Sequence, residues 1–376
     1  MQKSVEYEKL MNRIKEEYQS YVGKKIIFIF SCISLNFLIA GISATLGSYH
    51  LTIGEVYSII WLGTLKIIQN LNFIFSSGIE EFLNSFSKEE KVIWALRLPR
   101  ILMGILTGAS LAIAGVVMQS ILRNPLASPY TLGISASAGF GASVAIIYGT
   151  GLISWISLKY LIIANAFLFS LIPVFVILVV TRIKGTTPET MILAGIAMTY
   201  IFHGYLQLVY YFSEAEAMKE AYFWLVGSLG RASWDNIPLN FLIFCLCFLL
   251  LFGKSWDLNA MQLGDEVAKS LGVDVERMRI LILLIASFLT ASVVSFVGTI
   301  GFIGLIAPHV CRIFIGGDNR YLIPASAFFG SAFLLAMDTI GRTIIAPVII
   351  PVGVIMDCIG GPFFFYILMR RRREYW

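Results

Sequence analysis

The residue types that most often perform catalysis are few in this sequence and form no catalytic pattern. The three histidines, His50, His203 and His309, lie in different segments, and no H-E-x-x-H motif occurs. A metalloprotease needs those groups on one helix face, so we predict no catalytic residue and no metal site. For His309, a hydrogen-bonded structural role is favoured over metal ligation because no second histidine lies at a chelating spacing.

A nucleotide site is not expected either. Gly253-Lys254-Ser255 matches the end of a phosphate-binding loop, but the motif needs a glycine where Phe248 stands, and the context is the end of an apolar run. The five cysteines lie in or beside apolar runs without C-x-x-C spacing, which is typical of small buried side chains. We therefore expect the chain itself to bind no cofactor.

Two carboxylates stand inside apolar segments, where charge is costly. Asp338 and Asp357 are the only acidic residues that we place within such segments. A charge at a membrane-helix centre costs about 2.5 to 3.5 kcal/mol, so each is expected to pair with Arg342 or to face a pathway. Gln119, also deep in an apolar run, is expected to bond another helix or to line a pathway.

The composition identifies the elements that must hold these residues. The chain is 58% hydrophobic and only 14% charged, with a mean hydropathy of +0.82, whereas soluble domains are about 25% charged. Continuous apolar runs, long enough to cross about 30 Å of hydrocarbon, predict membrane helices rather than strands. The clearest runs are Ile26–Leu46, Ile101–Leu122, Gly133–Gly149, Tyr160–Val180, Met191–Phe212, Ile237–Phe252, Ile280–Val297, Phe302–Ile315, Leu322–Gly341 and Val352–Met369.

The basic residues predict how these helices are oriented. With the N-terminus inside, ten crossings return the C-terminus to the cytosol, and the inner segments then hold 19 basic residues against nine outside. The net charge of +5 is therefore a topology signal and not a nucleic-acid footprint. We expect residues 1–25 to form a cytoplasmic segment, 26–369 a single membrane domain with an inner loop at 253–279, and 370–376 a basic cytoplasmic tail.

Two features of the membrane domain stay open at this stage. The outer residues 51–75 could form a re-entrant or interfacial helix or an extra span. Gly108 to Ala142 and Gly298 to Ala332 look weakly alike and would lie upside down relative to each other, which predicts an all-α protein with inverted-repeat-like halves.

Small residues and prolines mark close packing and helix breaks. Gly108 and Gly115 share one face of a predicted helix and permit a neighbouring helix to approach closely. Pro125 biases Asn124 away from helical dihedrals and so ends that helix. A second dense region predicts a close contact or a broken helix from Gly298, Gly301 and Gly304, and a bend at Pro308.

Several of these stretches together resemble a known family. R-L-P-R from Arg97, G-A-S-L-A-I-A-G-V-V-M-Q, R-N-P-L-A-S-P-Y-T-L-G-I, G-F-I-G-L-I-A-P-H-V-C-R and the P-V-G-V and G-G-P-F-F ending occur in order between Trp94 and Arg372. They resemble the FecCD-type permeases of iron-siderophore, haem and cobalamin ATP-binding-cassette (ABC) importers. A longer outer segment before Trp94 is the main departure.

The resemblance implies partners and a substrate class rather than an enzymatic activity. It implies a cytoplasmic-membrane permease that forms a dimer, a homodimer or a pair of close relatives. It also implies two cytoplasmic ATPase subunits, which hold ATP-Mg, and an outer substrate-binding protein. An iron-siderophore is the leading substrate, with cobalamin or haem as alternatives and an ion-coupled secondary transporter as the rival class. No nucleic-acid partner is expected, and membrane lipid surrounds the chain.

The resemblance also assigns roles to residues. The inner loop from Met261 reads as a short amphipathic pattern and is expected to contact the ATPase. The contact residues are Leu263, Gly264, Val267, Ala268, Leu271, Gly272 and Val273. Arg97, Arg100 and Arg342 are expected on the outer side to pair with acids of the binding protein, or to anchor helix ends in headgroups. The expected pathway and packing residues are Gly108, Gly115, Gln119, Asn124, Pro125, Ser135, Ser137, Phe140, Gly301, Gly304, Pro308 and His309.

Overall fold

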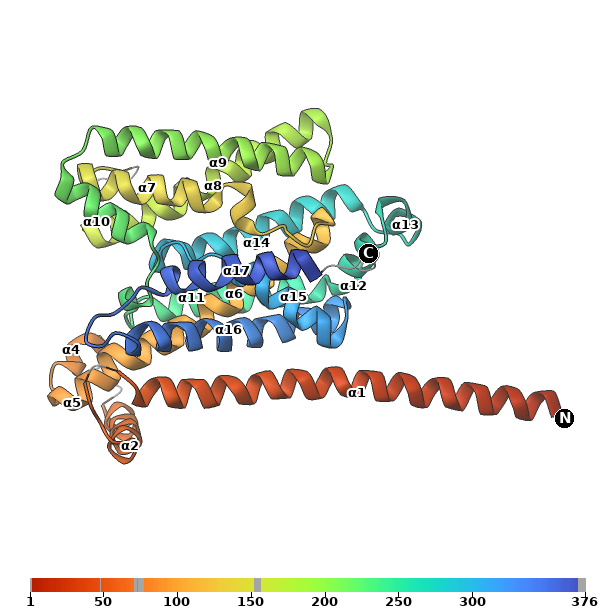
Figure 1. Ribbon diagram of the computed structural model, residues 1–376, viewed down its shortest axis with the longest axis horizontal. Helices are drawn as coiled ribbons and strands as arrows, with labels where there is room; N and C mark the ends of the chain where they lie inside the picture. Colours follow the sequence, from red (N-terminus) through yellow and green to blue (C-terminus); the bar gives the residue numbers. More distant parts are fainter. Residues whose placement is uncertain (1, 48, 71–72, 74–77, 152–156, 371–376) are drawn as a thin grey trace.

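The computed structural model describes residues 2–47, 49–70, 73, 78–151 and 157–370, and all regular structure in these ranges is helical (Figure 1). Each predicted apolar run coincides with one helix. These helices are α1 (Gln2–Thr45), α6 (Leu98–Leu122), α7 (Ile134–Tyr148), α8 (Leu158–Lys184), α9 (Pro188–Tyr211), α11 (Ile237–Gly253), α14 (Val275–Val297), α15 (Ile303–Ile315), α16 (Asn319–Thr343) and α17 (Val352–Arg370).

Shorter helices lie at the two ends of this bundle. At one end are α2, α4, α5 and α10, and at the other are α12 and α13, beside the end of α17 (Figure 1). The shorter elements are α2 (Ile53–Gln69), α4 (Ile79–Leu83), α5 (Lys88–Lys91), η1 (Val92–Arg97), η2 (Pro129–Leu132), α10 (Ala215–Leu225), η3 (Leu229–Arg231), α12 (Ser255–Gln262) and α13 (Asp265–Ser270). The predicted topology makes the α12–α13 end cytoplasmic, and we call it the inner end.

The helices have the length and composition of membrane spans. Within the part of the chain that the structure describes, six helices are long and apolar enough to cross a bilayer, and the pair α11–α12, bent by 54°, makes a seventh if it is counted as one span. The apolar segments Ile134–Tyr148, Ile303–Ile315 and Val352–Tyr366 are shorter. The multi-pass all-α architecture is therefore confirmed, while ten crossings, cytoplasmic termini and inverted halves stay predictions.

Helix α6 lies at the centre of the molecule. In the most apolar stretch of the span that contains α6, 89% of the residues are buried inside the protein, compared with 22% for α9 and 17% for α1. Its small residues make this possible: a Cβ on Gly115 would lie 1.9 Å from the carbonyl oxygen of Gly304 on α15, and one on Gly108 would lie 2.5 Å from that of Gly330 on α16. The predicted close packing of Gly108, Gly115 and Gly304 is confirmed.

Helix α1 extends beyond the predicted apolar run Ile26–Leu46 on its N-terminal side. It is continuous from Gln2 to Thr45, and its N-terminal part extends well beyond the other helices (Figure 1). A cytoplasmic segment at residues 1–25 stays a prediction. Hydropathy marks only the part that hydrocarbon can surround, whereas helical backbone bonding continues into the charged sequence. The predicted tail at 370–376 lies outside the described residues except for Arg370, which ends α17.

A broken helix lies where the glycine-rich motif predicted one. Helix α14 ends at Val297 and α15 begins at Ile303, and Gly298 has a φ of +80°. The hydroxyl of Tyr130 accepts a hydrogen bond from the backbone N–H of Ile300 at 3.1 Å. Pro308 lies inside α15, which continues through it as one helix.

Candidate functional site

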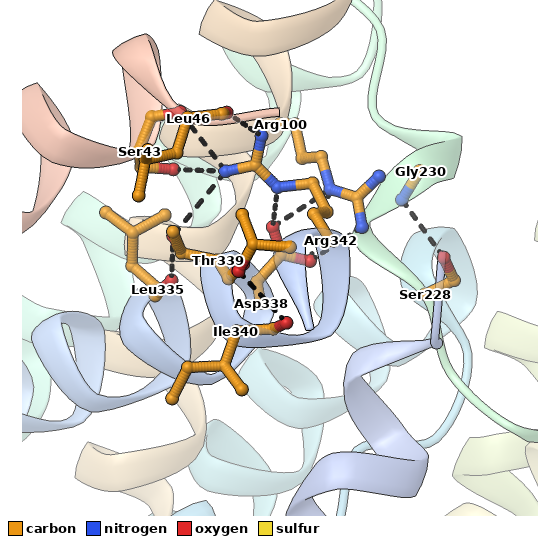
Figure 2. Close-up of polar contacts among 11 residues, drawn as sticks. Ser43, Leu46, Arg100, Ser228, Gly230, Leu335, Asp338, Thr339, Ile340 and Arg342 are labelled. Carbon is orange, nitrogen blue, oxygen red and sulfur yellow. Dashed lines mark hydrogen bonds and ion pairs between the residues drawn. The ribbon is translucent and has the colours of Figure 1, made fainter. Parts of the chain in front are cut away.

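At the outer end, Arg100 and Arg342 share one buried carboxylate, that of Asp338 (Figure 2). Arg100 on α6 binds Asp338 on α16 through both Nε and Nη2, at 2.9 and 2.8 Å. Arg342 Nε lies 3.1 Å from the same carboxylate, and its Nη2 donates to Ser43 on α1. Asp338 is fully buried. Its carboxylate joins α16 to α6 through Arg100, and Arg342 extends this network to α1. The predicted pairing of Asp338 with Arg342 is confirmed.

Arg97 stabilises the end of α1. Its guanidinium donates to the carbonyl oxygens of Ala44, Thr45 and Tyr49 at 2.6, 3.0 and 2.5 Å. The last carbonyl groups of a helix lack partners within it and carry partial negative charge, so a cation is favourable there. An arginine stays charged at neutral pH.

These contacts correct the expectation that the three arginines present free charge to the outside. Arg97, Arg100 and Arg342 are only 5%, 9% and 6% exposed, and their guanidinium groups bind atoms of this chain. The three side chains hold helix ends together within the protein, so the alternative of anchoring in lipid headgroups is not supported either. Docking of a partner by these arginines stays a prediction. It would require the outer arginine cluster, which consists of Arg97, Arg100, Arg342 and Asp338, to break its contacts within the chain, or the partner to bind exposed residues beside the cluster.

At the inner end, α12 and α13 form a small platform below the bundle. Helix α13 is shorter than the predicted amphipathic segment: Gly264 before it and Gly272 after it have φ values of +115° and +87°. Leu263, Val267 and Leu271 are 68%, 42% and 63% exposed, so they form an apolar surface, which we call the loop surface. All three side chains are exposed, while their predicted alignment on one side and their contact with an ATPase stay predictions.

Ala268 does not belong to the loop surface. Its predicted place beside Leu263 and Leu271 was wrong, because Ala268 is fully buried and packs into the main hydrophobic core. Gly264 and Val273 are partly buried, and Gly272 is exposed. The six-residue helix α13 therefore turns Val267 outward and the small Ala268 inward, against the membrane domain.

Arg279 attaches α13 to the membrane domain, and the sequence analysis did not assign it a role. It is 1% exposed. Its Nη2 donates to Asp265 on α13 at 2.8 Å, its Nε to the carbonyl of Ile121 on α6 at 3.0 Å, and its Nη1 to the carbonyl of Thr186 between α8 and α9. The sequence shows only that Arg279 is a basic residue before an apolar run. Its bonding partners could not be predicted because they come from three separate segments of the chain.

A second polar network joins α12 to two core helices. Gln262 donates to Ser120 on α6 at 2.9 Å. Asn259 donates to Asp318 at 2.8 Å and accepts from the backbone N–H of Asn319 at 2.8 Å, where α16 begins. Displacement of the α12–α13 platform would therefore act on several long helices at once.

The remaining predicted residues fall into two groups. Gln119 bonds other elements, as predicted: it accepts from Arg312 at 2.9 Å and donates to the Gly304 carbonyl at 3.3 Å. Asn124 accepts from the Leu126 N–H at 2.9 Å in the turn after α6 that contains Pro125.

Ser137 is fully buried, and its hydroxyl donates within its own helix. Phe140 packs against Phe169 and Phe202, with ring centroids 5.3 and 5.6 Å apart. Both therefore serve packing in this conformation. Ser135, Gly301 and His309 are partly buried, and a pathway role for them stays a prediction.

Asp357 contrasts with Asp338. It is exposed on α17, and its Oδ1 would lie 3.1 Å from a Cβ placed on Gly301 in the helix break. Among the described residues, no group of three or more His, Cys, Asp or Glu side chains could hold a metal ion.

The chain is similar to known membrane permeases over most of its length. The model of the FecCD transport family matches residues 35–370. A Methanocaldococcus jannaschii protein named as an ABC transporter permease is 43% identical over 364 residues, covering 95% of this chain and 98% of the relative. The hemin transport system permease protein of Yersinia pestis is 37% identical over 284 residues, covering 75% and 84%.

A solved inward-facing structure of a metal-chelate-type ABC transporter has the same fold. It superposes with a TM-score of 0.75 at 28% identity and covers 91% of this chain and 99% of that one. The chain therefore belongs to the FecCD transport family of ABC-importer permeases and is a multi-pass protein of the cytoplasmic membrane.

Proposed function

We propose that this chain is the translocation subunit of an ATP-driven importer for an iron(III)-siderophore or a similar metal chelate. Relatives that match it are named as permeases for hemin, iron(3+)-hydroxamate, Fe(3+)-citrate and cobalamin. These substrates are bulky chelates or metal-containing macrocycles. A cobalamin or haem permease is the second candidate, supported by the same relatives.

The observation that supports ATP coupling most directly is the loop surface. Leu263, Val267 and Leu271 are exposed at the inner end, and acidic Glu266 and Asp274 lie beside them. Exposed apolar side chains need a cover, and anionic lipid is a poor one beside carboxylates. A cytoplasmic ATPase subunit is the partner that fits, and it would hold the ATP-Mg that the chain itself is not expected to bind.

The assembly proposed is a dimer of permease chains with two ATPase subunits inside and a substrate-binding protein outside. Closure of the ATPases would push on the loop surface. Because Arg279 and Gln262 tie this platform to α6 and to neighbouring helices, the push would rock the helices and open the central pathway alternately outward and inward. Selectivity would reside largely in the binding protein.

The test is transport by the reconstituted complex. The chain, its ATPase and its binding protein would be incorporated in vesicles, and uptake of a ferric hydroxamate, haem and cobalamin would be compared with and without internal ATP. ATP-dependent uptake of the hydroxamate is expected. Uptake that survives ATP depletion and collapses with the ion gradient would instead indicate a secondary transporter, and uptake of cobalamin or haem alone would favour the second candidate.

A further inference from the structure

Helix α2 presents an apolar stripe that no described residue of the chain covers. Ile53, Tyr57, Trp61 and Ile68 are between 49% and 67% exposed, and Leu65 is 38% exposed. The spacing of four, four, four and three residues places them along one side of the helix. Two of the five are a tryptophan and a tyrosine, the residues that favour the boundary between membrane and water.

The neighbouring side of α2 is packed against the protein. Val56 is fully buried in a cluster at the outer end that also contains Trp94. A Cβ on Gly63 would lie 2.1 Å from the Trp94 ring nitrogen, which donates to the carbonyl of Ile59 at 3.2 Å. The helix is therefore fixed in its rotation, and the exposed stripe has a defined direction.

The third side of α2 is mostly polar. Glu55, Ser58, Lys66 and Gln69 are exposed there, with Leu62 as the one large apolar exception. Glu55 forms a capping box with Thr52, which fixes the start of the helix, and Lys66 pairs with Glu90 at 2.5 Å. The helix thus has one side for protein, one apolar side and one side suited to water.

The position of α2 indicates where the apolar side points. Figure 1 shows α2 almost end-on, whereas α1 and α16 lie in the plane of the view, so α2 runs crosswise to the spanning helices at the outer end of α1. A Cβ on Gly41 of α1 would lie 2.7 Å from the hydroxyl of Tyr57. Because Gly41 lies within the predicted first span, Tyr57 reaches from α2 toward the membrane and not away from it.

We infer that α2 is an interfacial anchor: it lies along the outer surface of the bilayer with Ile53, Tyr57, Trp61, Leu65 and Ile68 inserted at the boundary between headgroups and acyl chains. A crosswise helix of 17 residues with this division of sides is typical of such anchors. A transmembrane role does not fit, because α2 does not run parallel to the spans. Of the three alternatives that the sequence left open, this assigns the interfacial helix to the described part, α2 (Ile53–Gln69).

The anchor gives the outer arginine cluster a fixed support. The cluster that holds Trp94 continues through η1 into Arg97, whose contacts cap α1. Lipid insertion of α2 would therefore hold the outer ends of α1 and α6 at a constant depth while other helices move.

Spin labelling of the full complex tests the depth of α2. Single cysteines would replace Trp61 and Ile68 on the stripe, and Leu62 and Gln69 on the third side as matched controls, in a variant whose five native cysteines are replaced and whose uptake activity is retained. The complex would be placed in phosphatidylethanolamine–phosphatidylglycerol vesicles. Labels at 61 and 68 should be more accessible to oxygen than to an aqueous nickel chelate, and labels at 62 and 69 should show the reverse.

Two results would overturn the inference. Equal accessibility of all four labels to the nickel chelate would place α2 in water, and protection of positions 61 and 68 from both reagents would mean that protein covers the stripe. A second measurement avoids cysteine replacement: in vesicles of lipids brominated near the headgroup, Trp61→Phe should lower the quenchable tryptophan emission, whereas Trp256→Phe, at the inner end on α12, should leave quenching by bromine in the outer leaflet unchanged.

Discussion

Asp338 accepts three hydrogen bonds from Arg100, across 238 positions of sequence, at 3.1, 2.9 and 2.8 Å. The pair joins the outer ends of α6 and α16, and Arg342 adds a further bond to the same carboxylate at 3.1 Å. Removal of one partner from a buried ion pair leaves an uncompensated charge and is strongly destabilising. The packing of the outer ends of α6 and α16 therefore depends on this pair.

Asp338→Asn should destabilise the protein strongly. The change would leave the Arg100 and Arg342 guanidinium groups buried without their counter-charge, and breaking a buried ion pair costs about 3 to 5 kcal/mol. Thermal unfolding of the detergent-purified chain would measure the loss. Asp357→Asn is the matched control, since Asp357 is exposed on α17; equal unfolding temperatures for the two variants would contradict the role of the cluster.

Arg279→Lys should uncouple the α12–α13 platform from the membrane domain. One ammonium group cannot reproduce the fork that reaches Asp265, Ile121 and Thr186. A hydrogen bond to a charged group contributes about 1.5 to 3 kcal/mol, so ATP-driven uptake should fall about tenfold or more while ATP hydrolysis continues. Uptake per ATP hydrolysed is the readout, and Arg277→Lys, on an exposed side chain, is the control. Proportional loss of both activities would indicate a simple folding defect.

The extent of the spans could be predicted because hydrocarbon thickness limits the apolar runs, but the full helices could not. The run Ile280–Val297 ends where α14 ends, yet α14 begins five residues earlier, at Val275. There the Asp274 side chain caps the helix by accepting from the Arg277 N–H at 3.2 Å. Such a polar first turn lies outside the hydrocarbon, so hydropathy does not detect it.

The partner of a polar side chain could be named from the sequence only where the two residues lie close together in the chain. Asp338 and Arg342 are four residues apart on one helix, and their pairing was expected. The partners of Arg100 and Arg279 are distant, and only the fold brings them together. Ala268 was misplaced because a helical pattern drawn from Leu263 ignores the breaks at Gly264 and Gly272.

Gly115→Ala should separate α6 from α15. The added methyl group would lie 1.9 Å from the Gly304 carbonyl oxygen, and overpacking typically costs about 1 to 3 kcal/mol. Gly204→Ala on α9 is the control, because its Cβ meets nothing within 4 Å and alanine is favoured over glycine in a helix by about 1 kcal/mol. Gly115→Ala should therefore lower the unfolding temperature and Gly204→Ala should raise it. A rise for both variants would contradict the close contact between Gly115 and Gly304.

Asp318 should make stability depend on pH in the acidic range. Burial acts to raise its pKa, but hydrogen bonds from Arg320 and Asn259 outweigh this and lower the pKa to about 2. A carboxyl whose pKa is lowered on folding stabilises the protein above its unfolded pKa of about 3.9, and this contribution is lost as the pH falls toward 2. Unfolding temperatures measured between pH 5 and about pH 2 should fall less steeply for Asp318→Asn. An identical fall of the unfolding temperature with pH in the unaltered protein and in Asp318→Asn would mean that the hydrogen bonds from Arg320 and Asn259 to Asp318 do not form.

Leu271→Glu should abolish ATP-coupled transport without unfolding the chain. Leu271 is 63% exposed, so a charge there costs little in the isolated subunit, whereas burial of that charge under an ATPase subunit would not be compensated. We expect weaker co-purification of the ATPase and loss of substrate-stimulated ATP hydrolysis in the reconstituted complex. Ser270→Glu adds the same charge at the neighbouring exposed position, outside the loop surface, and should have a smaller effect. Because α13 is held from its buried side by Ala268 and Arg279, the unfolding temperature should not change. Full uptake by Leu271→Glu would mean that the ATPase docks elsewhere.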